Sequence, residues 1–118
     1  MVCGEVWQVN LAVPPGDTAA REALALVVQD AAYGRGSPMV LVAPLTEDPN
    51  AIGFPGTVCM QPNEQNGLES DATAMVFQLR AIDRSRFVAK VGEVPEETLN
   101  EVLGEVDRLT GRTPKARD

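Results

Sequence analysis

Two long aliphatic runs set the strongest limit on how this chain can fold. The segments ALALVVQ (23–29) and PMVLVAPL (38–45) consist almost entirely of β-branched or other aliphatic residues. Such runs are typical of strands covered on both faces, whereas a half-exposed strand alternates apolar and polar residues. We therefore expect these two segments to form the centre of one sheet.

Shorter patterns predict the rest of the sheet. GEVWQVNL (4–11) alternates, with Trp7, Val9 and Leu11 on one face, as in a half-buried strand. Two further strands are predicted at ATAMVFQL (72–79) and FVAKVGEV (87–94), and TVCM (57–60) lies between a loop and a turn-rich segment. Loops or turns rich in proline, glycine or charge are predicted at 12–22, 47–56, 61–70 and 80–86, and a turn or one short helix at 30–37.

The segment PEETLNEVLGEVDRLTG (95–111) predicts one helix. Its apolar residues recur at helical spacing, Pro95 suits the first helical position, and Gly111 suits the cap beyond the last turn. Five or more short strands and one closing helix indicate a mainly β domain, a small barrel-like antiparallel sheet with a C-terminal helix beside it. We expect one domain over 1–111 and a short flexible tail over 112–118.

Composition narrows the function. The chain has no histidine, which removes the commonest general base and metal ligand, and we expect neither a metal nor a cofactor. Its net charge of −7 disfavours extensive phosphate binding, so any contact with nucleic acid should be local. Cys3 and Cys59 are expected to be free thiols. No apolar run is long enough to span a membrane and no leader pattern is visible, so a cytoplasmic location is expected.

Six short segments occur in an order that indicates a family. They are GEVW (4–7), LVVQ (26–29), VAPLT (42–46), GFPGTV (53–58), QLRAIDRSR (78–86) and EVPEETLNEVLGEV (93–106). Together they cover about residues 3 to 110, and the chain resembles the MazF/PemK/Kid family of bacterial toxins. The resemblance implies a CcdB/PemK/MazF-like fold, which is an SH3-like barrel with a C-terminal helix.

The resemblance also implies an activity and partners. Members are homodimers that are bound by a cognate antitoxin protein. They cleave single-stranded RNA at short sequences without a metal, through attack of the ribose 2′-OH on the adjacent phosphate, which leaves a cyclic phosphate. That reaction needs a base for the 2′-OH, an acid for the leaving oxygen and a donor or cation against the charge that develops on the phosphate.

Three family positions supply these groups, and this chain keeps one of them. Thr46 matches the family threonine that ends the PLT segment. The family arginine and proline before the second strand fall on Ala23 and Leu24, and the acidic residue that precedes the glutamine of the QxR segment in some members falls on Phe77. The resemblance therefore implies a site in which two of three catalytic positions are vacant.

Each candidate catalytic residue has a structural alternative. Thr46 either faces the RNA groove or caps a strand before the turn EDPN, where a hydroxyl bonds local backbone. Arg21, two residues before the usual arginine position, either reaches the same phosphate or is a solvated loop cation. Glu22 either serves as a base or is simply solvated.

The candidate RNA-binding residues are Gly53, Phe54, Phe77 and Arg80. Gly53 and Phe54 match a family loop that lines the groove, and the alternative is a simple turn with a packed phenylalanine. Phe77 either stacks on a base or packs in the core or an interface. Arg80 belongs to the basic stretch RAIDRSR, which either neutralises phosphates or forms a structural turn in which Asp83 and Arg80 tie the sheet to the helix.

The expected function is that of a type II toxin, a sequence-specific endoribonuclease weakened by loss of the usual arginine and acidic residue. The alternative is a catalytically silent member that acts as an antitoxin- or nucleic-acid-binding regulatory dimer. A third class, a gyrase-poisoning toxin on the related fold, has no supporting residue in this sequence.

Overall fold

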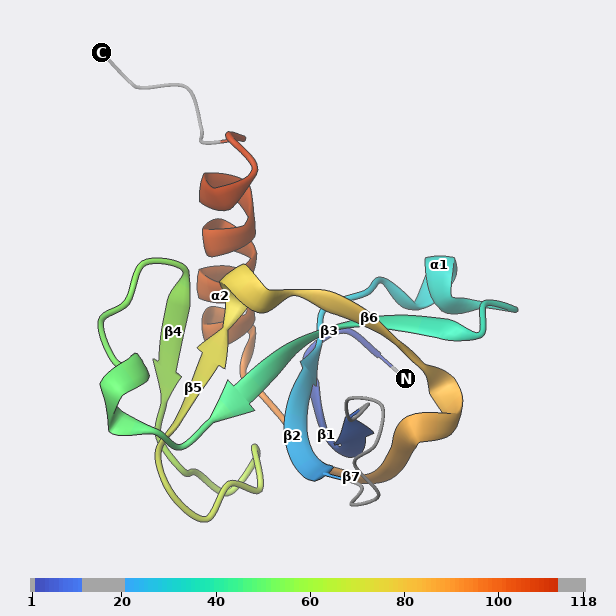
Figure 1. Cartoon of the computed structure of the whole chain (residues 1–118), viewed down its shortest axis with the longest axis horizontal. Helices are drawn as coiled ribbons and strands as arrows, with labels where there is room; N and C mark the ends of the chain where they lie inside the picture. The colour runs from blue at the N-terminus through green and yellow to red at the C-terminus, as the bar shows by residue number, and fades with distance from the viewer. Residues whose placement is uncertain (1, 12–20, 113–118) are drawn as a thin grey trace, which may run out of the picture.

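The computed structural model describes residues 2–11 and 21–112. Within them, seven strands form one antiparallel sheet in the order β4-β5-β3-β2-β1-β7, and β6 pairs with β3 (Figure 1). The strands are β1 (Glu5–Leu11), β2 (Arg21–Val27), β3 (Met39–Thr46), β4 (Thr57–Met60), β5 (Ala72–Met75), β6 (Arg80–Asp83) and β7 (Phe87–Glu93). The helices are α1 (Ala31–Gly34), α2 (Glu96–Leu109) and the 3₁₀ turns η1 (Pro49–Ala51), η2 (Val76–Gln78) and η3 (Arg84–Arg86). The predicted fold class, mainly antiparallel β with a C-terminal helix, is confirmed.

The two aliphatic runs form the centre of the sheet, as predicted. In β2, Leu26 belongs to a hydrophobic cluster that includes Val102 of α2, whereas its neighbours Ala25 and Val27 belong to a second cluster on the other side. We call the side of the first cluster the α2 face and the other side the opposite face. β3 contributes to both clusters in the same way, because successive side chains of a strand point to opposite faces.

Helix α2 packs through one stripe of its apolar residues and leaves another exposed. Val102 is fully buried, and Leu99 and Val106 pack against the same cluster. Leu103 and Leu109, which share the predicted helical period, are 37% and 49% exposed. Pro95 is the N-cap rather than the first helical residue, and Gly111 has a φ of +80° directly beyond the C-cap. Figure 1 shows α2 standing beside β4 and β5.

The structure corrects three boundaries. Arg21 and Glu22, predicted as loop, begin β2 because they pair with Leu11 and Asn10 of β1. Arg80 to Asp83, predicted as a charged turn, form β6, which pairs with β3. The predicted strand 72–79 ends at Met75 and continues as η2. The predicted loop 12–20 lies outside the described residues, as do residues 113–118 of the predicted tail.

Strand β3 changes its partner along its length. Val42 pairs with Arg80 of β6, and Leu45 pairs with Ala74 of β5. Val42 and Leu45 are three residues apart in β3, whereas their partners Arg80 and Ala74 are six residues apart. The segment from β5 to β6 therefore has three residues more than β3 can pair with. These residues are η2, and they bulge out of the sheet.

The described residues contain no helix that is long and apolar enough to cross a membrane. Cys3 is partly buried, Cys59 is exposed, and both are free thiols, as predicted.

The loop between β4 and β5 is fastened to β7 by close backbone contact. Asn66 is buried, its Oδ1 accepts hydrogen bonds from the backbone N–H groups of Asn63 and Leu68, and its Nδ2 donates to Gln61 O. Gly92 of β7 lies so near this loop that an added Cβ would be 2.4 Å from the carbonyl carbon of Asn66. Only a glycine fits there without movement of the backbone.

We predict that Gly92→Ala lowers the free energy of unfolding by about 1–3 kcal/mol, because the new methyl group overpacks a contact between two backbones. Urea unfolding measures the loss. The matched control is Gly104→Ala in α2, where an added Cβ meets no atom within 4 Å. That control should be stabilised by about 0.5–1 kcal/mol, the usual gain when alanine replaces glycine in a helix. Equal stability of Gly92→Ala and the native chain would contradict the prediction.

Glu5 anchors the start of β1 as a buried carboxylate. Its Oε1 accepts hydrogen bonds from Trp7 Nε1 at 2.9 Å and from the backbone N–H of Val2 at 3.0 Å, and its Oε2 lies 3.2 Å from Lys90 Nζ of β7. Burial alone would raise the pKa of Glu5. The hydrogen bonds from Trp7 and Val2 and the charge of Lys90 outweigh burial, so the pKa lies below its ordinary value.

We predict that Glu5 makes folding stability depend on pH in the acid range. Its pKa is lower in the folded than in the unfolded chain, so its contribution is complete above about pH 4.3, the ordinary glutamate pKa, and is lost as the pH falls through the lower folded value. Glu5→Gln should cost about 1–3 kcal/mol at neutral pH and flatten this part of the profile. Denaturant unfolding at a series of pH values measures both effects.

The matched control is Glu93→Gln. Glu93 lies 4.0 Å from the same lysine nitrogen, but its side chain is 54% exposed. Exposed pairs contribute about 0–1 kcal/mol, so this variant should follow the native pH profile. A Glu5→Gln variant with the native acid profile would show that the buried carboxylate is not responsible.

Candidate functional site

Two of the positions that the resemblance assigns to catalysis, 23 and 46, lie side by side at one end of the sheet. Leu24 of β2 pairs with Leu45 of β3, so the next residues, Ala23 and Thr46, are neighbours across the two strands. Leu24 and Leu45 pack toward the α2 face, and strand alternation therefore places Ala23 and Thr46 together on the opposite face. On its other side Thr46 pairs with Thr73 of β5. The sheet thus brings Ala23 next to Thr46, the residue for which the sequence predicts a catalytic role.

Thr46 also caps its strand. Its Oγ1 accepts a hydrogen bond of 3.1 Å from the backbone N–H of Asp48, the local bond expected of a hydroxyl before a turn. The hydroxyl hydrogen has no acceptor among the described residues, so it can still be donated to a ligand. The cap and the site-facing alternatives for Thr46 are therefore compatible.

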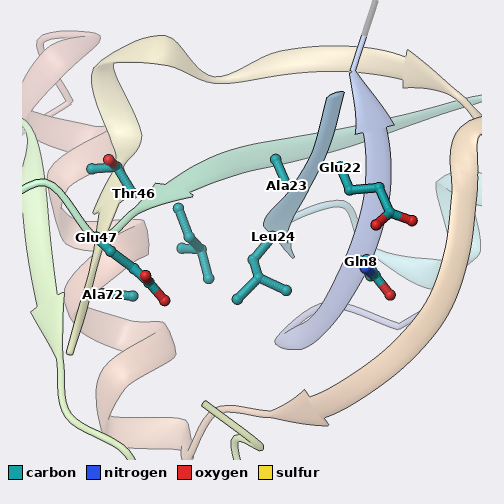
Figure 2. Close-up of a pocket in the computed structure, with 8 residues that line it drawn as sticks. Gln8, Glu22, Ala23, Leu24, Thr46, Glu47 and Ala72 are labelled. Atoms are coloured by element: carbon teal, nitrogen blue, oxygen red, sulfur yellow. The ribbon is translucent and has the colours of Figure 1, made fainter. Parts of the chain in front are cut away.

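A hollow of about 360 Å³ opens beside these positions, mainly on the α2 face. Figure 2 shows Glu47 and Thr46 on one side of it and Glu22 and Gln8 on the other, with the side chain of Glu47 pointing away from that of Thr46. Glu47 Oε2 accepts a hydrogen bond of 2.9 Å from Ser70 Oγ. The described lining contains two carboxylates and no lysine or arginine. This hollow is therefore poorly suited to a phosphate group.

A second hollow, of about 170 Å³, lies beyond the end of β3. Phe54, Met75 and Phe77 make it apolar, and Ala51, Asp48 and Asn50 complete its lining. Phe54 is 60% exposed and Phe77 is 47% exposed, so both rings are open to a ligand. We call this hollow the phenylalanine pocket. It unites two of the four predicted RNA-binding residues.

Of the other two predicted RNA-binding residues, Gly53 adjoins the phenylalanine pocket and Arg80 lines neither hollow. Gly53 precedes Phe54, has a φ of +85°, and has open space where a Cβ would be. Its positive φ shapes the loop that carries the ring. Arg80 begins β6 opposite Val42 and lines neither hollow.

The remaining arginines of the basic stretch serve the fold. Arg84 Nε donates to Ser37 O at 3.2 Å, and Arg86 Nη1 lies 3.5 Å from Asn10 O. Asp83 Oδ1 accepts a bond from the backbone N–H of Ser85, and hydrogen bonding by Ser85 lowers the pKa of Asp83. These bonds favour the structural interpretation of the turn, although they join it to the segments around Ser37 and Asn10 rather than to the helix.

Arg21 is placed only in part. Its backbone begins β2 in register with Leu11, two positions before Ala23, and its side chain lies outside the described part of the structure. Asp48, Asn50 and Met75 are pocket residues that sequence reasoning missed. The one available signal was the turn EDPN, in which an aspartate before a proline is typical of the cap of a short helical turn.

Comparisons with known proteins define the class. A family model described as "PemK-like, MazF-like toxin of type II toxin-antitoxin system" matches residues 3–110. The chain therefore belongs to the PemK-like, MazF-like family of type II toxins. No curated protein matches the sequence.

Solved structures agree with this assignment. A crystal structure of MazE–MazF from Deinococcus radiodurans contains a chain that is 26% identical, with a TM-score of 0.78 over 96% of this chain and 97% of that one. MazF from the same organism is 28% identical, with a TM-score of 0.71 over 93% and 94%. A mycobacterial endoribonuclease in complex with its cognate antitoxin is 19% identical, with a TM-score of 0.73 over 94% and 95%, which shows a shared fold.

Proposed function

We propose that this toxin is a metal-independent endoribonuclease of single-stranded RNA that cleaves slowly and is held in check by a cognate antitoxin. The observation that carries the proposal is the placement of Thr46 beside position 23, with its Oγ1 bonded to the backbone N–H of Asp48, a residue that lines the exposed pocket with two aromatic rings. Aromatic faces stack on unpaired bases, and a hydroxyl at the end of the strand can donate to a phosphate oxygen. The solved relatives add support, since one is described as an endoribonuclease with its antitoxin.

Slow cleavage follows from what surrounds Thr46. Position 23 carries alanine, and neither hollow has a lysine or arginine in its described lining. Loss of one positioned donor against a developing charge commonly costs about a hundredfold or more in rate. Arg21 lies two positions earlier in the same strand, and we propose it as the replacement cation because alternate residues of a strand belong to the same face.

A second candidate function is a silent toxin homologue that binds an antitoxin or nucleic acid without cleavage. One observation favours it. The larger hollow beside position 23 carries Glu22 and Glu47, which oppose phosphate binding, and the chain has a net charge of −7. Cleavage measurements separate the two candidates.

We predict that Ala23→Arg with Leu24→Pro raises metal-independent cleavage about a hundredfold or more, because it returns a cation beside Thr46. Adding Thr46→Ala to that variant should reverse the gain, and Arg21→Ala in the native chain should remove the residual activity. A long RNA incubated with each protein in EDTA measures the rates.

The control for these variants is the melting temperature, which separates loss of activity from loss of folding. Rapid cleavage by the native chain that Arg21→Ala abolishes would show that Arg21 is sufficient and that the site is not weakened. If neither the native chain nor the Ala23→Arg, Leu24→Pro variant cleaves RNA, and Thr46→Ala changes only the stability, the homologue without cleavage activity is favoured.

We also propose that the toxin is a homodimer. A hollow of about 300 Å³ on its surface is lined by Val76, Phe77, Leu79, Val106 and Leu109 with only Thr110 as a polar neighbour. Phe77 and Leu109 in this lining are exposed, so the hollow is an apolar area over η2 and the end of α2. Areas of this kind on small proteins commonly mark interfaces, and a symmetric dimer buries the same patch on both subunits.

We predict a dimer mass by light scattering at micromolar protein and a monomer mass for Leu109→Lys, because a buried lysine opposes association. Val88→Lys on β7 is the matched control, since Val88 is 48% exposed and Leu109 is 49% exposed. That control should stay dimeric. A native chain that is monomeric at every concentration would overturn the dimer.

A further inference from the structure

Asp48 is a charged residue that lines the phenylalanine pocket. Neither the sequence analysis nor the family pattern gives Asp48 a role. It follows Thr46 by two residues, and its backbone N–H donates to Thr46 Oγ1 at 3.1 Å. Asp48 lines the pocket together with Phe77. Phe77 occupies the position at which some family members carry their acidic residue. The structure thus brings an acidic residue from a neighbouring loop to the pocket that Phe77 also lines.

The carboxylate of Asp48 is held in place with one oxygen available. Its Oδ1 accepts a hydrogen bond of 3.0 Å from the backbone N–H of Asn50, which caps η1 and fixes the direction of the side chain. Its other oxygen has no hydrogen-bond partner among the described residues. An oriented and solvent-accessible carboxylate oxygen is the group that general-base catalysis requires.

We propose that Asp48 is the general base of this toxin and takes over the part of the missing acidic residue. This inference rests on the proposed ribonuclease function. A general base at this pocket suits an RNA whose unpaired nucleobase stacks against Phe54 or Phe77. That stacking would hold the adjoining ribose beside the carboxylate. Thr46 Oγ1 accepts from the backbone N–H of Asp48, and its hydroxyl hydrogen can be donated to a phosphate oxygen.

The Asp48 carboxylate takes the proton of the ribose 2′-OH as the 2′-oxygen forms a bond to the adjacent phosphorus. The bond from phosphorus to the 5′-oxygen breaks, and that oxygen takes a proton from water. The products are a 2′,3′-cyclic phosphate and a free 5′-hydroxyl, and Asp48 returns its proton to the solvent.

Two substitutions test the base without removing the cap. Asp48→Asn keeps the shape and an oxygen that can accept from Asn50, but it cannot take a proton at neutral pH. Asp48→Glu keeps the carboxylate on a longer side chain. We expect Asp48→Asn to lower the single-turnover cleavage rate by about a hundredfold or more, since general bases contribute about 10²- to 10⁴-fold. Asp48→Glu should stay within about tenfold of its parent.

The matched control is Asp30→Asn. Asp30 Oδ1 accepts from the backbone N–H of Ala32 at 2.8 Å, a cap of the same kind on α1, and it lines neither hollow of the candidate site. This variant should cleave at the parental rate. Each substitution is made in the native chain and in the Ala23→Arg, Leu24→Pro chain, with RNA in EDTA, and light scattering and melting temperature confirm the parental state.

The outcomes separate the two proposals. A parental rate for Asp48→Asn in a chain that cleaves RNA overturns the base and leaves the ribonuclease intact. An equal loss of cleavage rate in Asp48→Asn and Asp48→Glu, with unchanged mass and stability, also overturns the general-base role, because a carboxylate at position 48 would then be insufficient. If no chain cleaves RNA, the Ala23→Arg, Leu24→Pro variant included, the ribonuclease function is overturned together with the general-base role of Asp48.

Discussion

Burial of the two central strands on both faces is the constraint on which the rest of the structure depends. β2 and β3 supply side chains to two separate hydrophobic clusters, so polar groups are excluded along most of their length. Chemistry can therefore appear only where these strands end. Thr46 is the first hydroxyl after the apolar run of β3, and it lies at the same end of the sheet as the start of β2. The location of the candidate site follows from the hydrophobic pattern.

The fold could be predicted because its main signals are local. Aliphatic runs, one alternating segment and one helical period determine most of the strands and α2. β6 was missed because its sequence, RAID, has a single buried side chain, Ile82, and becomes a strand only through pairing with β3. The start of β2 was missed for the same reason, since Arg21 and Glu22 extend a ladder whose other half is β1. Pairing between distant segments is not visible in local composition.

The candidate site was only partly predictable. Thr46, Phe54 and Phe77 stand in segments that resemble the family, so sequence could single them out. Asp48 could not be found in this way, because its position has no role in the family pattern and its neighbourhood with Phe77 arises from the three-dimensional arrangement of η1 and η2. The sequence also did not show which face of the sheet each side chain occupies. Strand alternation separates Glu47 from Thr46, although the two residues are adjacent in sequence (Figure 2).

The bulge at η2 has a consequence for how this site can diverge among relatives. Residues 76–78 make no ladder pair with β3, so the identity of residue 77 is not constrained by the register of the sheet. An acidic residue there can be exchanged for phenylalanine while β5 and β6 keep their partners. The same bulge contributes Phe77 both to the phenylalanine pocket and to the apolar area beside α2. One substitution at this point can therefore alter the phenylalanine pocket and the apolar area beside α2 together, while the pairing of the strands stays the same.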